Sequence, residues 1–225
     1  MTNHLEDSVH TITDETRRGP FSAAIRAASW GAHGDAEQAP FLAELVEGRL
    51  DRHGYARLVA QHHFAYAALE GAADTMRHDP VAGPFVDDAL TRGPALAADL
   101  EALLGPGWRD RIEPSPATEA YVARMEEVCR DWAGGFVAHH YVRYMGDLSG
   151  GQMLRVSVEA ALGIDASSGA AFYAFPAITD LTAYKQTYRS RLDAAPWSDD
   201  ERERIIGEVL LGYRHNTAVL AELGR

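Results

Sequence analysis

The segment from Tyr141 to Gly151 places an acidic side chain among three glycines, in a stretch whose pattern is otherwise helical. Gly146, Gly150 and Gly151 fall within six residues and surround Asp147. Each glycine in a helix interior costs about 1 kcal/mol relative to alanine. A kink or close helix packing could explain one glycine, whereas three beside an aspartate indicate that the backbone closely approaches a flat ligand. We interpret the segment as a ligand-facing helix, with packing as the alternative.

Two other glycine motifs do not fit this segment. A phosphate-binding loop requires Lys and then Ser or Thr after its last glycine, but Gly151 is followed by Gln152 and Met153. A nucleophile elbow requires a glycine two residues before its serine, and Asp147 occupies that place before Ser149. The sequence therefore supports neither a nucleotide hydrolase nor a serine esterase.

A histidine and a glutamate in the first predicted helix, His33 and Glu37, are spaced so that they share one face. The carboxylate can accept the imidazole N–H, and a histidine held in this way suits an iron ligand. Taken alone, such a pair is more often an ordinary surface pair, and that alternative stays open. Arg26 lies on the same side of the helix, about 10 Å along the axis from His33. The apolar side of the helix comprises Phe21, Ala24, Ile25 and Ala28.

Other charged and imidazole side chains have ordinary explanations. Lys185 and Arg189 are spaced i, i+4, as on a solvated helix face, although the pair could also bind an anion. The side chains of His62–His63 and of His139–His140 diverge by about 100° on a helix, so we interpret both pairs as structural. No glutamate has a histidine three residues later, which argues against a ferritin-like di-iron site.

These residues must be positioned by helices. No segment alternates with period two long enough for a strand, so we expect a single all-α domain of about eight helices over residues 17–225. Asp51 is a predicted N-cap of a long helix, and Ser198 with Glu201 predicts a capping box. Residues 1–16 lack apolar periodicity and are expected to form a flexible N-terminal arm.

Composition limits the possible functions. The 225-residue chain has 33 acidic and 21 basic residues, a formal charge of −12, which argues against a general nucleic-acid binder. The single cysteine, Cys129, cannot form an internal disulfide or a Cys-rich metal site. No apolar run approaches the ~18 residues of a membrane helix, and the polar N-terminus does not resemble a signal peptide. We therefore expect a cytoplasmic protein that does not associate with membranes.

Four segments together resemble the heme oxygenase family. Residues 138–152 (AHHYVRYMGDLSGGQ) resemble its distal-helix signature, and residues 32–37 (AHGDAE) resemble its proximal-ligand segment. Residues 172–176 (FYAFP) and 185–191 (KQTYRSR) resemble later motifs in the same order. The likeness covers about residues 20–223. It implies that heme lies between a proximal N-terminal helix and a glycine-kinked distal helix, and is cleaved to biliverdin, carbon monoxide and ferrous iron.

The resemblance also implies a role for particular residues. His33 would be the axial iron ligand with Glu37 as its hydrogen-bond partner, and Asp147, Gly146 and Arg143 would be catalytic. The remaining heme-binding residues would be Arg26, Tyr141, Gly150, Gly151, Lys185 and Arg189. Heme b would be both substrate and cofactor, with O2 and electrons from a ferredoxin, a flavodoxin or an NAD(P)H reductase.

Two alternatives stay open beside this interpretation. One is a non-catalytic heme carrier on the same fold, which would need no acid such as Asp147 over the iron. The other is a thiaminase-like all-α enzyme, which relies on a nucleophilic cysteine, whereas Cys129 has no neighbouring base in the sequence.

Overall fold

A computed structural model describes residues 19–37 and 39–224, except for the side chains of residues 33 and 35–37. The expected N-terminal arm therefore lies outside the described residues. The described part contains nine α-helices and no strand, which confirms the predicted all-α class. The α-helices are α2 (Phe21–Glu37), α3 (Pro40–Val46), α4 (Arg52–Met76), α5 (Gly93–Leu104), α6 (Pro116–Val128), α7 (Ala133–His140), α8 (Gly150–Leu162), α9 (Leu181–Ala194) and α10 (Asp199–Leu223).

Short helical turns connect several of these helices. Three 3₁₀ turns, η1 (Gly83–Phe85), η2 (Asp88–Leu90) and η3 (Trp108–Arg111), lie in the connections on either side of α5. A π-helical turn, η4 (Tyr141–Met145), continues directly from α7. Within the described ranges, no helix has the length and apolar character needed to span a bilayer.

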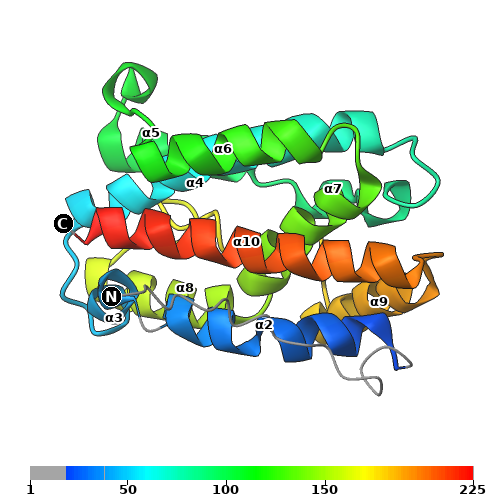
Figure 1. Cartoon of the computed structure of the whole chain (residues 1–225). Coiled ribbons are helices and arrows are strands. Elements are labelled where there is room, and N and C mark those ends of the chain that lie inside the picture. Colours follow the sequence, from blue (N-terminus) through cyan, green and yellow to red (C-terminus); the bar gives the residue numbers. More distant parts are fainter. Residues whose placement is uncertain (1–18, 38, 225) are drawn as a thin grey trace, which may run out of the picture.

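The long C-terminal helix α10 organises the packing. Figure 1 shows α10 across the middle of the molecule, with α6 and α4 on one side and α2 on the other. Helix α10 contacts α2, α3, α4, α6 and α7, while α4 also packs against α5, α6 and α7. Because α2 and the α7–η4–α8 segment border this common core, residues from both ends of the sequence can reach one site.

Local sequence explains where several helices begin. Asp51 caps α4 by accepting a hydrogen bond from the Gly54 amide at 2.7 Å, as predicted. Ser198 Oγ accepts from the Glu201 amide at 3.2 Å at the start of α10, which is one half of the predicted capping box. The Glu201 carboxylate is bound instead by Trp132 Nε1 and Arg204, because a tertiary partner competes with the local one.

The core explains the orientation of α2. Phe21, Ala24 and Ile25 are buried, with Ala28 partly buried beside them, so the predicted apolar face packs inward. Burial of a large apolar side chain contributes about 1.5–3 kcal/mol. This anchoring leaves Arg26 on the exposed side of the helix.

Candidate active site

The ligand-facing segment predicted from the glycines leaves regular helix twice. Helix α7 runs into the π-helical turn η4, and a turn at Leu148 and Ser149 precedes α8. π-helical turns are rare and are often found at functional sites. We call residues 141–151, which contain η4 and this turn, the distal segment.

The glycines of the distal segment differ in their surroundings. A Cβ atom added at Gly146 or Gly150 would meet no other atom within 4 Å, so the backbone faces open space there. At Gly151 the added Cβ would lie 3.3 Å from Tyr173 Cδ1, which provides a packing reason for that glycine. Gly146 and Gly150 therefore supply the open backbone that a flat ligand requires.

A cavity of about 120 Å³ lies against the distal segment. We call it the distal cavity. Its wall includes Gly146, Gly150 and Gly151 together with apolar side chains from α3, α4, α8 and α10. Its polar lining residues are His62, Arg143, Asp147, Tyr173, Tyr213 and Asn216.

Asp147 is buried in this wall and carries a perturbed carboxyl group. Its side chain accepts a hydrogen bond from the Tyr66 hydroxyl of α4. Burial raises the pKa of Asp147 to about 6, and this rise is opposed by the charge of Arg143, by the Tyr66 hydrogen bond and by Arg92. An acid with a pKa near the working pH can both hold and release a proton, which suits acid–base chemistry.

Arg143 is a buried cation on the same wall. Its Nη1 donates to Asn216 Oδ1 at 2.8 Å and its Nη2 to His62 Nδ1 at 3.0 Å. The guanidinium carbon lies 4.8 Å from the centre of the Tyr66 ring. Three elements, α4, η4 and α10, therefore hold one positive charge beside the distal cavity.

Two buried polar atoms of the cavity wall lack partners. Arg143 Nε and the Tyr173 hydroxyl form no hydrogen bond within the described protein. Because buried polar atoms are normally paired, such atoms indicate bound water or a polar ligand in the cavity. This polar wall and the open backbone at Gly146 and Gly150 fit a flat ligand that also has polar groups or bound water beside it.

The predicted anion-binding residues converge on Tyr141. Burial raises the pKa of the Tyr141 phenol, and the positive charges of Arg189 and Arg26 oppose this rise. Arg26 also stacks on the Trp30 ring, with its guanidinium carbon 5.8 Å from the ring centre. The structure thus brings together groups from α2, η4 and α9 that could bind carboxylates.

Lys185 forms hydrogen bonds to the distal segment. Its Nζ donates to the Leu148 carbonyl at 3.0 Å and to Ser149 Oγ at 3.3 Å. Helix α9 is therefore attached to the turn in the distal segment. The role of Lys185 toward a ligand stays a prediction.

The predicted iron ligand lies at the C-terminal end of α2. The backbones of His33 and Glu37 belong to this helix, but their side chains lie outside what the structure describes. Helix α2 packs against α10 and α9. The roles of His33 and Glu37 stay predictions.

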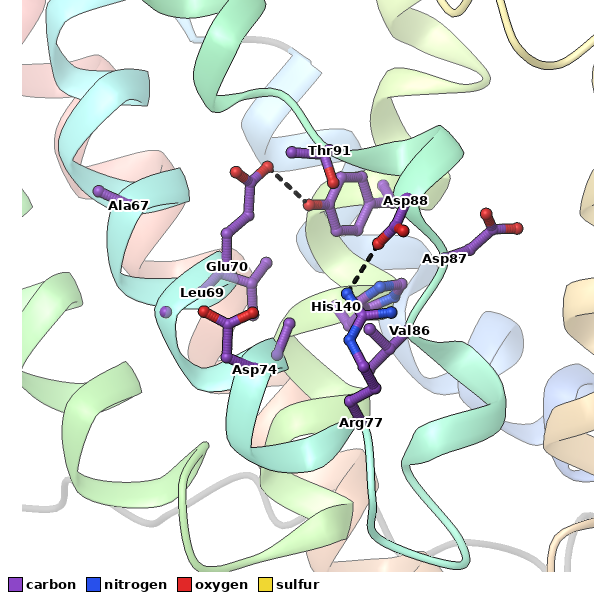
Figure 2. A pocket seen from close by; sticks show the side chains of 13 residues that line it. Ala67, Leu69, Glu70, Asp74, Arg77, Val86, Asp87, Asp88, Thr91 and His140 are labelled. Carbon is purple, nitrogen blue, oxygen red and sulfur yellow. Dashed lines mark hydrogen bonds and ion pairs between the residues drawn. The ribbon is translucent and has the colours of Figure 1, made fainter.

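A larger cavity, of about 320 Å³, is lined by α4, by the segment that carries η1 and η2, and by His140 and Tyr144. Figure 2 shows Glu70 and Asp74 of α4 on one side of it and Asp88, paired with Arg77 at 2.7 Å, on the other. Glu70 accepts from the Tyr144 hydroxyl at 3.1 Å and from the Gly93 amide at 3.1 Å. No cluster of three metal-ligating side chains occurs among the residues described. Glu70 therefore joins α4 to η4 and α5 beside this cavity, whose lining includes one glycine, Gly71, rather than the three of the distal cavity.

Burial accounts for the other histidines and for the cysteine. His139 Nε2 lies 2.9 Å from Glu208 Oε1 and His140 Nδ1 lies 2.9 Å from the Tyr188 hydroxyl, so both have structural partners as predicted. Cys129 is buried, and burial raises the pKa of its thiol above the ordinary value. Because a buried, protonated thiol is a poor nucleophile, the thiaminase-like alternative loses support.

Several residues in and around the distal cavity escape prediction from the sequence. The sequence predicts a structural role for His62 and does not single out Asn216, which lines the cavity, or Tyr66 and Arg92, which act on Asp147. His62 and Tyr66 are spaced i, i+4 and follow the buried face of α4 after Leu58. Polar aromatic side chains on a core-facing stripe are the available signal, because such groups require partners.

Comparison with known proteins agrees with this geometry. The heme oxygenase family model matches residues 19–222. A heme oxygenase of Rhodella violacea is 34% identical over 88% of this chain and 85% of its own length. Human heme oxygenase 1 is 36% identical over 90% of this chain and 71% of its own. The crystal structure of heme oxygenase-1 from Synechocystis in complex with heme superposes with a TM-score of 0.86 at 31% identity, covering 91% of this chain and 92% of that one. These likenesses extend over nearly the whole chain and agree with its glycine-lined distal cavity and buried acid, so the chain belongs to the heme oxygenase family.

Proposed function

We propose that this heme oxygenase cleaves heme at the distal cavity, with Asp147 as the acid that governs proton supply. The reaction converts heme into biliverdin, carbon monoxide and ferrous iron with O2 and external electrons. Heme, when bound, supplies the iron that activates O2. The protein must then hold the macrocycle, exclude bulk water and deliver protons.

Support for catalysis, rather than heme carriage, comes from Asp147. The carboxyl is buried, is bound by Tyr66 and has a pKa of about 6. Burying an ionisable group costs free energy. A heme carrier transfers no proton, so it would not need such a group over its ligand. Asp147 orders water in the distal cavity and passes protons through it. Because the Arg143 cation lowers the pKa of Asp147, most of these carboxyl groups are ionised near pH 7 and only a small fraction holds a proton to donate.

The other proposed roles rest on the resemblance of these segments to the motifs of the family. His33, on α2, would hold the heme iron through one ring nitrogen, and Glu37 would accept the N–H of the other ring nitrogen. Arg26, Tyr141, Lys185 and Arg189 bind the heme propionates. Gly146 and Gly150 let the backbone lie close to the macrocycle, while Gly151 also packs on Tyr173. A ferredoxin, a flavodoxin or an NAD(P)H-dependent reductase supplies the electrons.

The test compares the wild-type protein with Asp147→Ala. Hemin and a chemical reductant are added under air, and the Soret band, biliverdin and carbon monoxide are followed together. We expect the wild-type protein to form biliverdin, and Asp147→Ala to bind heme but to form little biliverdin while oxidising added phenols with peroxide. Undiminished biliverdin formation by Asp147→Ala would overturn the role of this residue. Stable heme binding without biliverdin in the wild-type protein would instead favour a carrier.

A further inference from the structure

Two neighbouring histidines of α4 have different surroundings. His62 lines the distal cavity, and its ring centre lies 5.0 Å from that of Phe172. His63 points elsewhere and meets the Trp108 ring edge-on at 5.0 Å. Adjacent side chains on a helix diverge by about 100°, which explains the difference. Only His62 of this pair belongs to the cavity wall.

The hydrogen bond between His62 and Arg143 fixes the position of the imidazole proton. Arg143 Nη2 lies 3.0 Å from His62 Nδ1. A guanidinium group can only donate, so Nδ1 must be the acceptor. Burial, together with the charge of Arg143, lowers the pKa of His62 well below its ordinary value. His62 is therefore neutral near pH 7, with its proton on Nε2 and its lone pair directed at Arg143.

Besides its contact with the Tyr66 ring, Arg143 has few hydrogen-bond partners to fix its position. Its Nη1 donates to Asn216 Oδ1, its Nη2 to His62, and its Nε has no partner in the described protein. Loss of the His62 acceptor would leave a second donor of this buried cation unpaired. Because an unpaired buried donor is costly, the guanidinium group would turn toward another acceptor or toward water.

The position of Arg143 affects the neighbouring acid. The groups that act on Asp147 are Arg143 of η4, Tyr66 of α4 and Arg92, which immediately precedes α5. All three oppose the effect of burial, and Arg143 has the largest effect of them. A displaced guanidinium group would therefore leave the carboxyl easier to protonate.

We propose that His62 is a positioning residue of the distal cavity, whose Nδ1 holds the Arg143 guanidinium group beside Asp147. This inference rests on the proposed role of Asp147 in proton supply. His62 acts through Arg143, so contact between its ring and heme is not required. The relevant atom is Nδ1, rather than the Nε2–H on the other side of the ring.

The test titrates the Asp147 carboxyl in the heme-free protein by ¹³C NMR, with the signal assigned by its loss in Asp147→Asn. His62→Leu removes the acceptor, and we expect the Asp147 midpoint to rise by about one pH unit. His62→Asn retains an acceptor oxygen near the place of Nδ1, and we expect it to restore a midpoint near the wild-type one. His63→Leu is the matched control on the same helix and should leave the midpoint unchanged. His62→Met replaces His62→Leu if the latter does not fold.

An unchanged midpoint in His62→Leu would overturn the proposal. A shift in His62→Asn as large as that in His62→Leu would also overturn it, since the acceptor at Nδ1 would then not be the feature that matters. Neither result would affect heme cleavage by the wild-type protein, so failure here is distinguishable from failure of the proposed function.

Discussion

Removal of one hydroxyl group from Tyr66 should shift the ionisation of the distal acid. The Tyr66 side chain is fully buried and its hydroxyl donates to Asp147. Its ring packs edge-on against Tyr144 at 5.5 Å and Phe172 at 5.3 Å. Because Tyr66→Phe retains these ring contacts, the substitution isolates the hydrogen bond.

The size of the shift can be worked out from the groups around Asp147. The carboxyl has a pKa of about 6, because burial raises it while Arg143, the Tyr66 hydrogen bond and Arg92 lower it. A hydrogen bond to a charged group contributes about 1.5–3 kcal/mol, and one pKa unit corresponds to about 1.4 kcal/mol. Tyr66→Phe should therefore raise the pKa by roughly 1–2 units. At pH 7 the ionised fraction would fall from about nine-tenths to between about a half and a tenth.

The assay combines a carboxyl titration of the heme-free protein with the pH dependence of biliverdin formation. If ionised Asp147 is needed, the loss of rate on the acid side moves to higher pH together with the NMR midpoint. Tyr144→Phe is the matched control, because the Tyr144 hydroxyl donates to Glu70 rather than to Asp147. A midpoint that stays in place or moves down in Tyr66→Phe would refute the reasoning. So would a shift of equal size in Tyr144→Phe.

Two further predictions concern heme binding. His33→Ala should still take up heme but with a changed Soret spectrum and greatly reduced turnover, whereas Glu37→Ala should lose about 10–100-fold in turnover. The control is His53→Ala, which changes an exposed histidine, and a wild-type spectrum in His33→Ala would exclude His33 as the ligand. Gly150→Ala should unfold at nearly the wild-type temperature, because its Cβ would meet no protein atom within 4 Å, yet bind heme at least about tenfold more weakly by Soret titration. Unchanged affinity would show that the macrocycle does not approach this backbone.

Local patterns in the sequence predict much of the fold. The buried face of α2 and the cap of α4 at Asp51 depend on residues within one or two turns, and both occur as expected. The second half of the Ser198–Glu201 capping box does not, because Trp132 from outside that helix binds the Glu201 carboxylate. Local rules thus fail where a distant side chain offers a competing partner.

The π-helical turn is not predictable from local pattern either. The glycines indicate an interrupted helix, but η4 lies before them, at Tyr141–Met145, where no glycine or proline occurs. Tertiary contacts hold this turn: Tyr144 is bound to Glu70 of α4, and Arg143 to His62 of α4 and Asn216 of α10. A turn with an extra residue changes which side chains share a face.

The histidines show most clearly that residue type and spacing do not reveal the hydrogen-bond partner of a side chain. The pairs His62–His63 and His139–His140 are alike in the sequence, yet His139 is bound to Glu208 and His62 to Arg143. The Arg143 guanidinium group can only donate, so His62 accepts at Nδ1, whereas the Glu208 carboxylate accepts and His139 donates from Nε2. The function of each ring therefore depends on the charge of a partner 69 or 81 residues away in the chain. For the same reason, the chemistry of Asp147 depends on residues outside the distal segment, because Tyr66 of α4 and Arg92 act on its carboxyl and His62 and Asn216 hold Arg143.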